Sequence, residues 1–225
     1  MSTTALRIEV NGMAAVSGIL QIPEMAIACY VMAHGAGAGM THPFMAAVAD
    51  GLAERRVATL RYQFPSMERG SKRPDKPALA QATVRAAVAV AARLVPSLPL
   101  FAGGKSFGGR MTSQAQAEAA LPAVQGLVFF GFPLHPAKKP SDTRAAHLFR
   151  IDSPMLFLQG TRDALADMTL LEAVVEKLGQ RASLFKVDDG DHAFHVPRRS
   201  GRADAEVLAE MLDEPVRWIA ATARR

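Results

Sequence analysis

Residues 101–110, FAGGKSFGGR, contain two overlapping patterns that could each support chemistry. Gly104-Lys105-Ser106 matches the end of the phosphate-binding loop G-x-x-x-x-G-K-[ST], whose backbone N–H groups wrap around a phosphate. That loop needs a glycine at position 99, where this chain has Pro99, and the residues before Gly104 are strand-like. The sequence therefore disfavours a nucleotide-binding protein, which stays only as a minor alternative.

The second pattern is the G-x-S-x-G from Gly104 to Gly108. It is typical of a sharp turn between a strand and a helix that exposes a nucleophilic serine. We expect the two glycines to approach each other across the turn, where a Cβ would crowd the backbone. A strand is predicted before the turn and an amphipathic helix after it, so the pattern predicts Ser106 as a nucleophile.

A serine hydroxyl is a weak nucleophile unless a base activates it. Sites built on this kind of turn have the chain order serine, acid, histidine. Asp163 follows a predicted strand at 154–160, and His192 follows another at 182–187. We predict Ser106 as the nucleophile, His192 as the general base and Asp163 as the carboxylate that orients the imidazole. His195 remains open as an alternative base, and Asp167 as an alternative acid.

The oxyanion formed by such an attack needs preorganised hydrogen-bond donors. One expected donor is the backbone N–H of Phe107, which opens the helix after the nucleophile. The second should come from the loop HGAGAGMTHP at 34–43, because its small residues let N–H groups turn inward. We predict Ala36, with Gly37 as the alternative. The loop also resembles a dinucleotide-binding G-x-G-x-x-G, but Met40 replaces the third glycine, so no nucleotide cofactor is expected.

The elements that must position these residues alternate along the chain. Strands are predicted at 6–10, 15–22, 26–35, 57–62, 98–104, 124–131, 154–160 and 182–187, with a hairpin turn at Asn11-Gly12. Helices are predicted at 43–56, 78–95, 107–120, 167–179 and 203–221, the last with a break or kink at Pro215. This alternation predicts one α/β domain over residues 1–225, with a mostly parallel sheet and helices on both faces. In such a sheet the ligand lies beyond the carboxyl ends of the strands, where the candidate catalytic residues fall.

Composition excludes several classes of protein. The chain is 49% hydrophobic and 21% charged, as in ordinary globular proteins. Its net charge of +5 is dispersed and not interleaved with aromatic residues, so no nucleic-acid surface is expected. No membrane span, signal peptide or metal-ligand spacing is recognisable, and the one cysteine permits no internal disulfide. The sequence predicts a cytoplasmic protein without metal or cofactor, acting on a small molecule, and makes no prediction of oligomeric state.

Three further residues are expected at the substrate pocket. Tyr62 ends the predicted strand at 57–62, Phe64 follows that strand, and Lys105 precedes the nucleophile. Two roles stay open for Lys105: an exposed residue that aids solvation, or a charge that favours a carboxylate on the acyl or leaving group. The segment 131–153, where a lid could be inserted, is too short for a cap of several helices. An open site without a large lid is predicted.

With these motifs in place, the chain resembles the α/β-hydrolase superfamily, and within it the small lidless hydrolases near dienelactone hydrolase. It is similar to a group that includes bacterial hypothetical hydrolases and the hydrolase-like subunit of a eukaryotic non-specific-lethal chromatin complex. The matching stretches are HGAGAGMTHPFM, RYQFPSMERGSKRPDKP, GGKSFGGRM, LQGTRD and GDHAFHVP. The resemblance implies the triad Ser106, Asp163 and His192, and neither metal nor cofactor. Dienelactone hydrolase itself uses a cysteine nucleophile, so Ser106 argues against dienelactone as the substrate.

The resulting expectation is a serine hydrolase that cleaves a small carboxylic ester or thioester through an acyl-serine intermediate. The alternative is a non-catalytic interaction module that retains the α/β-hydrolase fold, as the relatives in chromatin complexes suggest.

Overall fold

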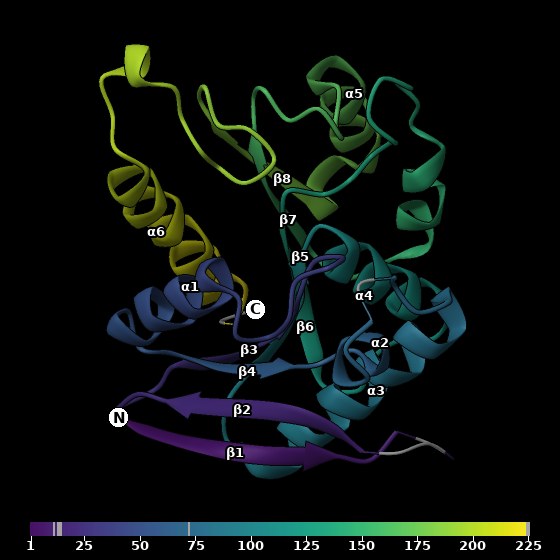
Figure 1. Cartoon of the computed structure of the whole chain (residues 1–225), viewed down its shortest axis with the longest axis vertical. Helices are drawn as coiled ribbons and strands as arrows, with labels where there is room; N and C mark the ends of the chain where they lie inside the picture. The colour runs from purple at the N-terminus through teal and green to yellow at the C-terminus, as the bar shows by residue number, and fades with distance from the viewer. Residues whose placement is uncertain (11, 13–14, 72, 224–225) are drawn as a thin grey trace.

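The computed structural model describes residues 1–10, 12, 15–71 and 73–223. Eight strands among these residues form one sheet in the order β1-β2-β4-β3-β5-β6-β7-β8 (Figure 1). They are β1 (Ser2–Ile8), β2 (Val16–Ile22), β3 (Ala28–Ala33), β4 (Val57–Tyr62), β5 (Leu100–Lys105), β6 (Val124–Phe130), β7 (Met155–Gly160) and β8 (Ala182–Val187). β1 pairs with β2, and β2 with β4, in antiparallel fashion; all other pairs are parallel. The predicted mostly parallel sheet is confirmed.

Helices cover both faces of this sheet. The helices are α1 (Pro43–Glu54), α2 (Pro65–Glu68), α3 (Pro77–Leu94), α4 (Phe107–Glu118), α5 (Met168–Leu178) and α6 (Asp204–Thr222), with short 3-10 helices η1 (Thr143–Arg150), η2 (Gly179–Arg181) and η3 (Arg198–Ser200). Figure 1 shows α1 and α6 on one side of the sheet and α3, α4 and α5 on the other.

The core is correspondingly divided into two layers. Side chains alternate along β3, so that Tyr30 and Met32 pack with α1 and α6, whereas Val31 packs with α3, α4 and α5. Successive residues of a strand point to opposite faces. Because both faces are covered, β3 is apolar throughout its length, which explains the continuous apolar run in the sequence.

The structure differs from the predicted elements chiefly at the first strand and the last helix. β1 covers residues 2–8 and lies earlier than the predicted 6–10; Asn11 of the predicted hairpin turn is outside the described residues. α6 continues through Pro215 without a break. The proline removes one backbone hydrogen bond, but Met211, Leu212 and Ile219 are buried on either side of it, and their packing against the sheet holds the helix together.

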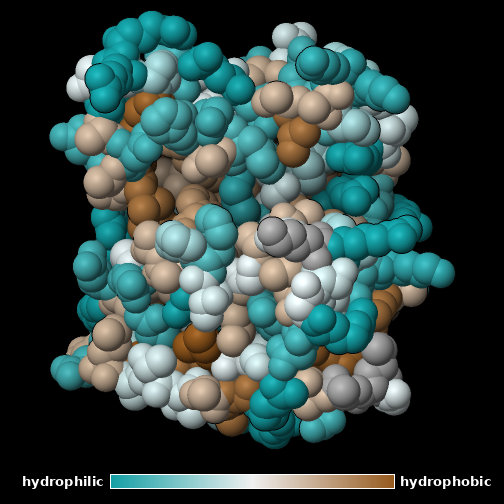
Figure 2. Space-filling view, viewed as in Figure 1, coloured by the Kyte–Doolittle hydropathy of each residue, from teal (hydrophilic) through white to brown (hydrophobic). Residues whose placement is uncertain are grey.

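The connection between β6 and β7 leaves the top of the sheet uncovered by any large lid. All its residues are described, and they contain a single 3-10 helix, η1. Apolar side chains on the face seen in Figure 2 form scattered patches within a mostly hydrophilic surface. Within the described part of the chain, no helix combines the length and apolarity needed to cross a membrane.

Candidate active site

Ser106 lies in the turn between β5 and α4, and its backbone is strained. Its φ is 50° and its ψ is −116°, a conformation that costs on the order of 1–3 kcal/mol and that clusters at functional sites. The turn is held on both sides, because Ser106 N–H donates to Phe130 O and Arg110 N–H donates to Ser106 O, each at 3.1 Å. This geometry presents the Ser106 side chain beyond the carboxyl end of β5.

The two glycines of the G-x-S-x-G pattern are needed because the turn lies against the end of β3. A Cβ on Gly104 would lie 2.1 Å from Ala33 O, and one on Gly108 would lie 2.5 Å from His34 O. The crowding therefore comes from a neighbouring strand, rather than from the two glycines approaching each other as the sequence suggested. Gly109 is the glycine that faces Gly104 across the turn, since its Cβ would lie 2.8 Å from Gly104 O.

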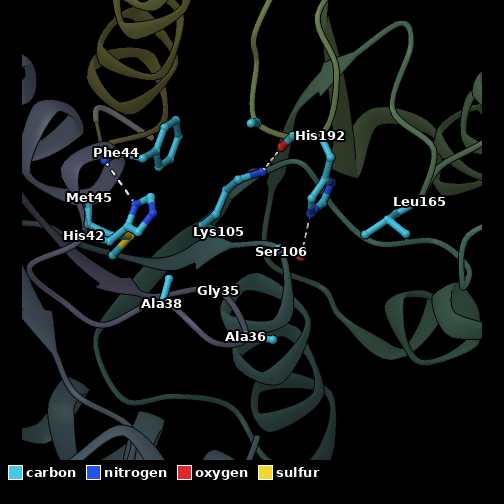
Figure 3. Close-up of a pocket in the computed structure, with 11 residues that line it drawn as sticks. Gly35, Ala36, Ala38, His42, Phe44, Met45, Lys105, Ser106, Leu165 and His192 are labelled. Atoms are coloured by element: carbon cyan, nitrogen blue, oxygen red, sulfur yellow. Dashed lines mark hydrogen bonds between the residues drawn. The ribbon is translucent and has the colours of Figure 1, made fainter. Parts of the chain in front are cut away.

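The structure brings Ser106, His192 and Asp163 into one hydrogen-bonded chain. His192 Nε2 lies 2.8 Å from Ser106 Oγ, and His192 Nδ1 lies 2.7 Å from Asp163 Oδ2. Figure 3 shows the His192 ring facing Ser106 from a separate loop. Because the ionised Asp163 carboxylate can only accept, Nδ1 carries the proton and Nε2 is free to accept from the serine hydroxyl. The His192 side chain is 28% exposed and can meet a ligand.

Asp163 is fully buried and held by more than the imidazole. Its Oδ2 also accepts from Gln159 Nε2 at 2.6 Å, and its Oδ1 accepts from Leu165 N–H at 2.7 Å. Gln159 Oε1 in turn accepts from Phe132 N–H at 2.9 Å, which ties the carboxylate to the connection after β6. Sequence reasoning did not identify Gln159. The signal was present, since it is a polar residue at the end of an otherwise apolar strand.

The alternative base His195 and the alternative acid Asp167 form hydrogen bonds outside the candidate catalytic residues. His195 is exposed, and its Nδ1 lies 2.7 Å from Asp204 Oδ2, a pairing that raises its pKa. Asp167 caps α5, because its carboxylate accepts from Leu170 N–H at 3.1 Å. Neither residue hydrogen-bonds to the chain formed by Ser106, His192 and Asp163.

The loop that carries His192 is shaped by Asp191. Its carboxylate oxygen Oδ1 accepts from Ala193 N–H at 2.7 Å and from His195 N–H at 3.0 Å. The Asp191 and Phe194 backbones close the same turn with two further hydrogen bonds, Asp191 N–H to His195 O and Phe194 N–H to Asp191 O. Asp191 is therefore a structural residue of this loop.

A cavity of about 310 Å³ opens beside Ser106 and His192, within the size range of ligand pockets. Its walls are mostly apolar (Figure 3). They consist of Gly35, Ala36, Ala38, His42, Phe44, Met45, Lys105, Ser106, Leu165, His192 and Ala193. His42, Phe44, Met45, Leu165 and Ala193 were not predicted. They come from the start of α1 and from the loops after β7 and β8, which only the folded chain brings together.

The prediction that Tyr62 and Phe64 line this pocket is wrong. Their exposed fractions are 0% and 1%, and neither borders the cavity. Both rings pack edge-on inside the core, at a centroid separation of 5.6 Å. Instead of contacting a ligand, Phe64 supports the loop after β3, because its N–H donates to His34 Nε2 at 3.0 Å.

Of the two predicted oxyanion donors, Phe107 directly follows Ser106 at the start of α4, and Ala36 borders the same cavity as Ser106. The loop carrying Ala36 is positioned by His34, whose Nδ1 donates to Gly35 O at 2.8 Å. Burial lowers the pKa of His34 to about 4, so the ring is neutral and can accept from Phe64 as well. Within the described chain, neither Ala36 N–H nor Phe107 N–H donates to another residue. Ala36 borders the cavity, whereas the alternative, Gly37, does not.

Lys105 is enclosed in the cavity wall. Its Nζ donates to His192 O, and it lies 4.8 Å from the Phe194 ring centroid and 5.6 Å from that of Phe44. Burial lowers the pKa of Lys105 to about 8, although Asp163 and Asp191 act in the opposite direction. The side chain is therefore not the exposed solvating residue that one of the two sequence hypotheses described. No carboxylate of the described residues forms an ion pair with it.

Comparison with known proteins places this chain in a family. The model of an alpha/beta hydrolase domain matches residues 26–220. Dienelactone hydrolase from Anabaena variabilis superposes with a TM-score of 0.78 at 21% identity, covering 98% of each chain. A lidless α/β serine hydrolase from Xanthomonas campestris gives 0.73 at 20% identity, covering 97% of this chain and 95% of the other. Est1E from Butyrivibrio proteoclasticus with bound ferulic acid gives 0.75 at 16% identity, covering 98% and 100%. Because the family model spans most of the sequence, the chain belongs to the α/β-hydrolase family.

Proposed function

We propose that the protein is a serine hydrolase that cleaves small carboxylic esters or thioesters through an acyl-serine intermediate. The observation that carries this proposal is the continuous hydrogen-bonded chain from Ser106 Oγ through His192 to Asp163, at 2.8 Å and 2.7 Å, beside a ligand-sized cavity. The strained backbone of Ser106 adds support, because a chain with no use for the serine would gain stability by relaxing it.

The acylation step follows from the proton positions. As Ser106 Oγ attacks the carbonyl carbon, its proton passes to His192 Nε2, and Asp163 stabilises the imidazolium that results. The carbonyl oxygen becomes an oxyanion, and in this proposal the N–H groups of Phe107 and Ala36 bind it. When the tetrahedral intermediate collapses, the bond to the leaving group breaks and His192 gives its proton to the departing oxygen or sulfur.

Deacylation repeats these steps with water as the nucleophile. His192 takes a proton from a water molecule as that water attacks the acyl carbonyl, and the same two N–H groups bind the second oxyanion. The ester bond to Ser106 then breaks, Ser106 Oγ recovers the proton from His192, and the carboxylic acid leaves. The absence of a large lid over the described β6–β7 connection favours substrates of modest size that enter from solvent.

Covalent labelling tests the nucleophile directly. A fluorophosphonate probe should form one adduct on Ser106, located by peptide mass spectrometry, because only an activated serine displaces the fluoride. The Ser106→Ala variant should remain unlabelled. Wild-type protein without an adduct at Ser106 would contradict the proposal and favour a non-catalytic interaction module.

Lys105 narrows the expected substrate class to esters that carry a carboxylate. Its ammonium group is buried in a cavity wall that is otherwise largely apolar, without a carboxylate partner among the described residues. A charge in such surroundings interacts more strongly with an opposite charge than it would in water. Est1E, which shares the fold, has been solved with ferulic acid, a carboxylic acid, bound to it.

This preference should depend on pH. p-Nitrophenyl hemisuccinate carries a carboxylate on its acyl group, and p-nitrophenyl butyrate does not. We expect the hemisuccinate to have the higher kcat/KM below pH 8. The Lys105 pKa is lowered to about 8, so the ammonium is lost and the ratio of the two kcat/KM values falls as the pH rises through that value. Any effect of pH that acts on both substrates alike cancels in the ratio.

Lys105→Met should remove the preference at every pH, whereas the exposed Lys139→Met should retain it. An unchanged ratio in Lys105→Met would show that Lys105 only holds the His192 loop.

A further inference from the structure

A second cavity, of about 410 Å³, lies between α4 and η1 and shares no lining residue with the catalytic cavity. It is bordered by Arg110, Gln114, Thr143, Arg144, Ala146, His147 and Arg150. Neither the sequence patterns nor the proposed hydrolysis gives this cavity a role.

The geometry of the 3-10 helix η1 explains why the basic residues of η1 lie on one side of it. In a 3-10 helix, side chains three residues apart are eclipsed. Arg144, His147 and Arg150 follow that spacing along η1 and therefore lie on one face of it. On α4, Arg110 and Gln114 are four residues apart, which places them on one face of an α-helix. The two faces meet at the cavity.

The three arginines of this cavity lack an ion-pair partner among the described residues. Within the described chain, Arg110, Arg144 and Arg150 form no ion pair, whereas other arginines do, as in the contacts Arg7–Glu68 and Arg55–Asp213. Arg110 Nε is buried and has no hydrogen-bond partner among the described residues. The Arg144 guanidinium forms a long hydrogen bond of 3.5 Å to Pro133 O.

The positive charges are close enough to influence one another. The pKa of Arg110 is lowered by burial and then by the charge of Arg144. Burial, followed by Arg110 and Arg150, lowers the pKa of His147 to about 4, so this ring is neutral and acts as a structural partner of Ser113 at 2.7 Å. Three arginines without an ion pair among the described residues border this one cavity, and an anion bound there would offset their charge.

We propose that this cavity binds the phosphate group of a small phosphomonoester. Guanidinium groups present planar pairs of N–H donors that match phosphate oxygens, and a phosphate offers three oxygens to three arginines. Thr143 and Gln114 border the same space and add polar side chains to its wall. The site does not depend on the proposed hydrolase activity.

Calorimetric titration of the full chain at constant ionic strength tests the site. Glycerol 3-phosphate should bind, with inorganic phosphate as a second probe and chloride as the background anion. Arg110→Gln and Arg144→Gln should each weaken binding roughly ten- to a hundredfold, because each removes charge-assisted hydrogen bonds. Arg73→Gln, which removes the same charge from an exposed loop position, should change the affinity less than about twofold.

Binding measurements on variants of the catalytic cavity show whether the ligand binds at this site or at the catalytic one. Ser106→Ala and Lys105→Met should bind glycerol 3-phosphate as the wild type does, so a failed hydrolase proposal leaves this test intact. Arg144→Gln should not lower the melting temperature, because it relieves repulsion, and this keeps a loss of binding distinct from a loss of fold.

Three outcomes would overturn the proposal: no binding of glycerol 3-phosphate by the wild type, equal binding by the arginine variants, or binding lost in Lys105→Met.

Discussion

Replacing either Ser106 or His192 with alanine is expected to lower kcat for p-nitrophenyl acetate by about 10⁶-fold. The two residues act as one unit, since His192 Nε2 lies 2.8 Å from Ser106 Oγ and each is ineffective without the other. The double variant should therefore be no slower than either single variant. Steady-state rates measured with active-site titration would establish this, with circular dichroism confirming that each variant is folded.

His195→Ala supplies the matched control. This histidine lies three residues further along the same loop, but it is exposed and pairs with Asp204 at 2.7 Å. Removing it should change kcat by less than about tenfold, which is within what a small shift of the loop can cause. If His195→Ala abolished turnover and His192→Ala preserved it, the assignment of the base would be wrong. If neither had an effect, the protein would not use this site for hydrolysis.

Gly104→Ala is expected to have a large effect on stability. Its Cβ would lie 2.1 Å from Ala33 O and 2.8 Å from Ala33 N, both backbone atoms of the adjacent strand β3, which cannot move aside. The φ of +146° adds strain for any residue with a side chain. Overpacking and backbone strain together should reduce the free energy of unfolding by on the order of 3–6 kcal/mol. A fall in melting temperature of roughly 10–20 °C follows.

Gly201→Ala separates the two contributions. Gly201 has a φ of +70°, but nothing lies within 4 Å of the position its Cβ would take. The Gly201→Ala variant should therefore show only the cost of backbone strain, a loss of about 1 kcal/mol in the free energy of unfolding. This loss corresponds to a fall of about 2–4 °C in melting temperature. A loss in Gly104→Ala no greater than that in Gly201→Ala would show that the turn can move away from β3.

Several features of the fold could be predicted from local pattern. Continuous apolar runs indicated strands buried on both faces, and their alternation with amphipathic segments indicated a parallel sheet between two layers of helices. The ends of the helices and strands were less predictable. α6 passes through Pro215 because burial of Met211, Leu212 and Ile219 outweighs the lost hydrogen bond, and local sequence does not report that burial.

At the site, chain order and loop position were sufficient to predict that Ser106, Asp163 and His192 lie together. Parallel strands end at the same edge of a sheet, so residues just beyond different strands are brought close whatever the intervening sequence. Position after a strand did not, however, determine which way a side chain points. Tyr62 is the last residue of β4 and Phe64 lies just beyond it, at the same edge of the sheet as Asp163, yet both side chains are buried in the core.

The sequence by itself determined the type of chemistry, because a serine between two glycines, followed by an acid and a histidine at strand ends, is a local and ordered signal. The tertiary structure decided everything that depends on contacts between distant segments. It placed Gln159 on Asp163, set Gly104 against β3, buried Lys105 between Phe44 and Phe194, and gathered three arginines between α4 and η1. Such contacts join residues far apart in the chain, and their geometry is set by the packing of whole elements rather than by the residues alone.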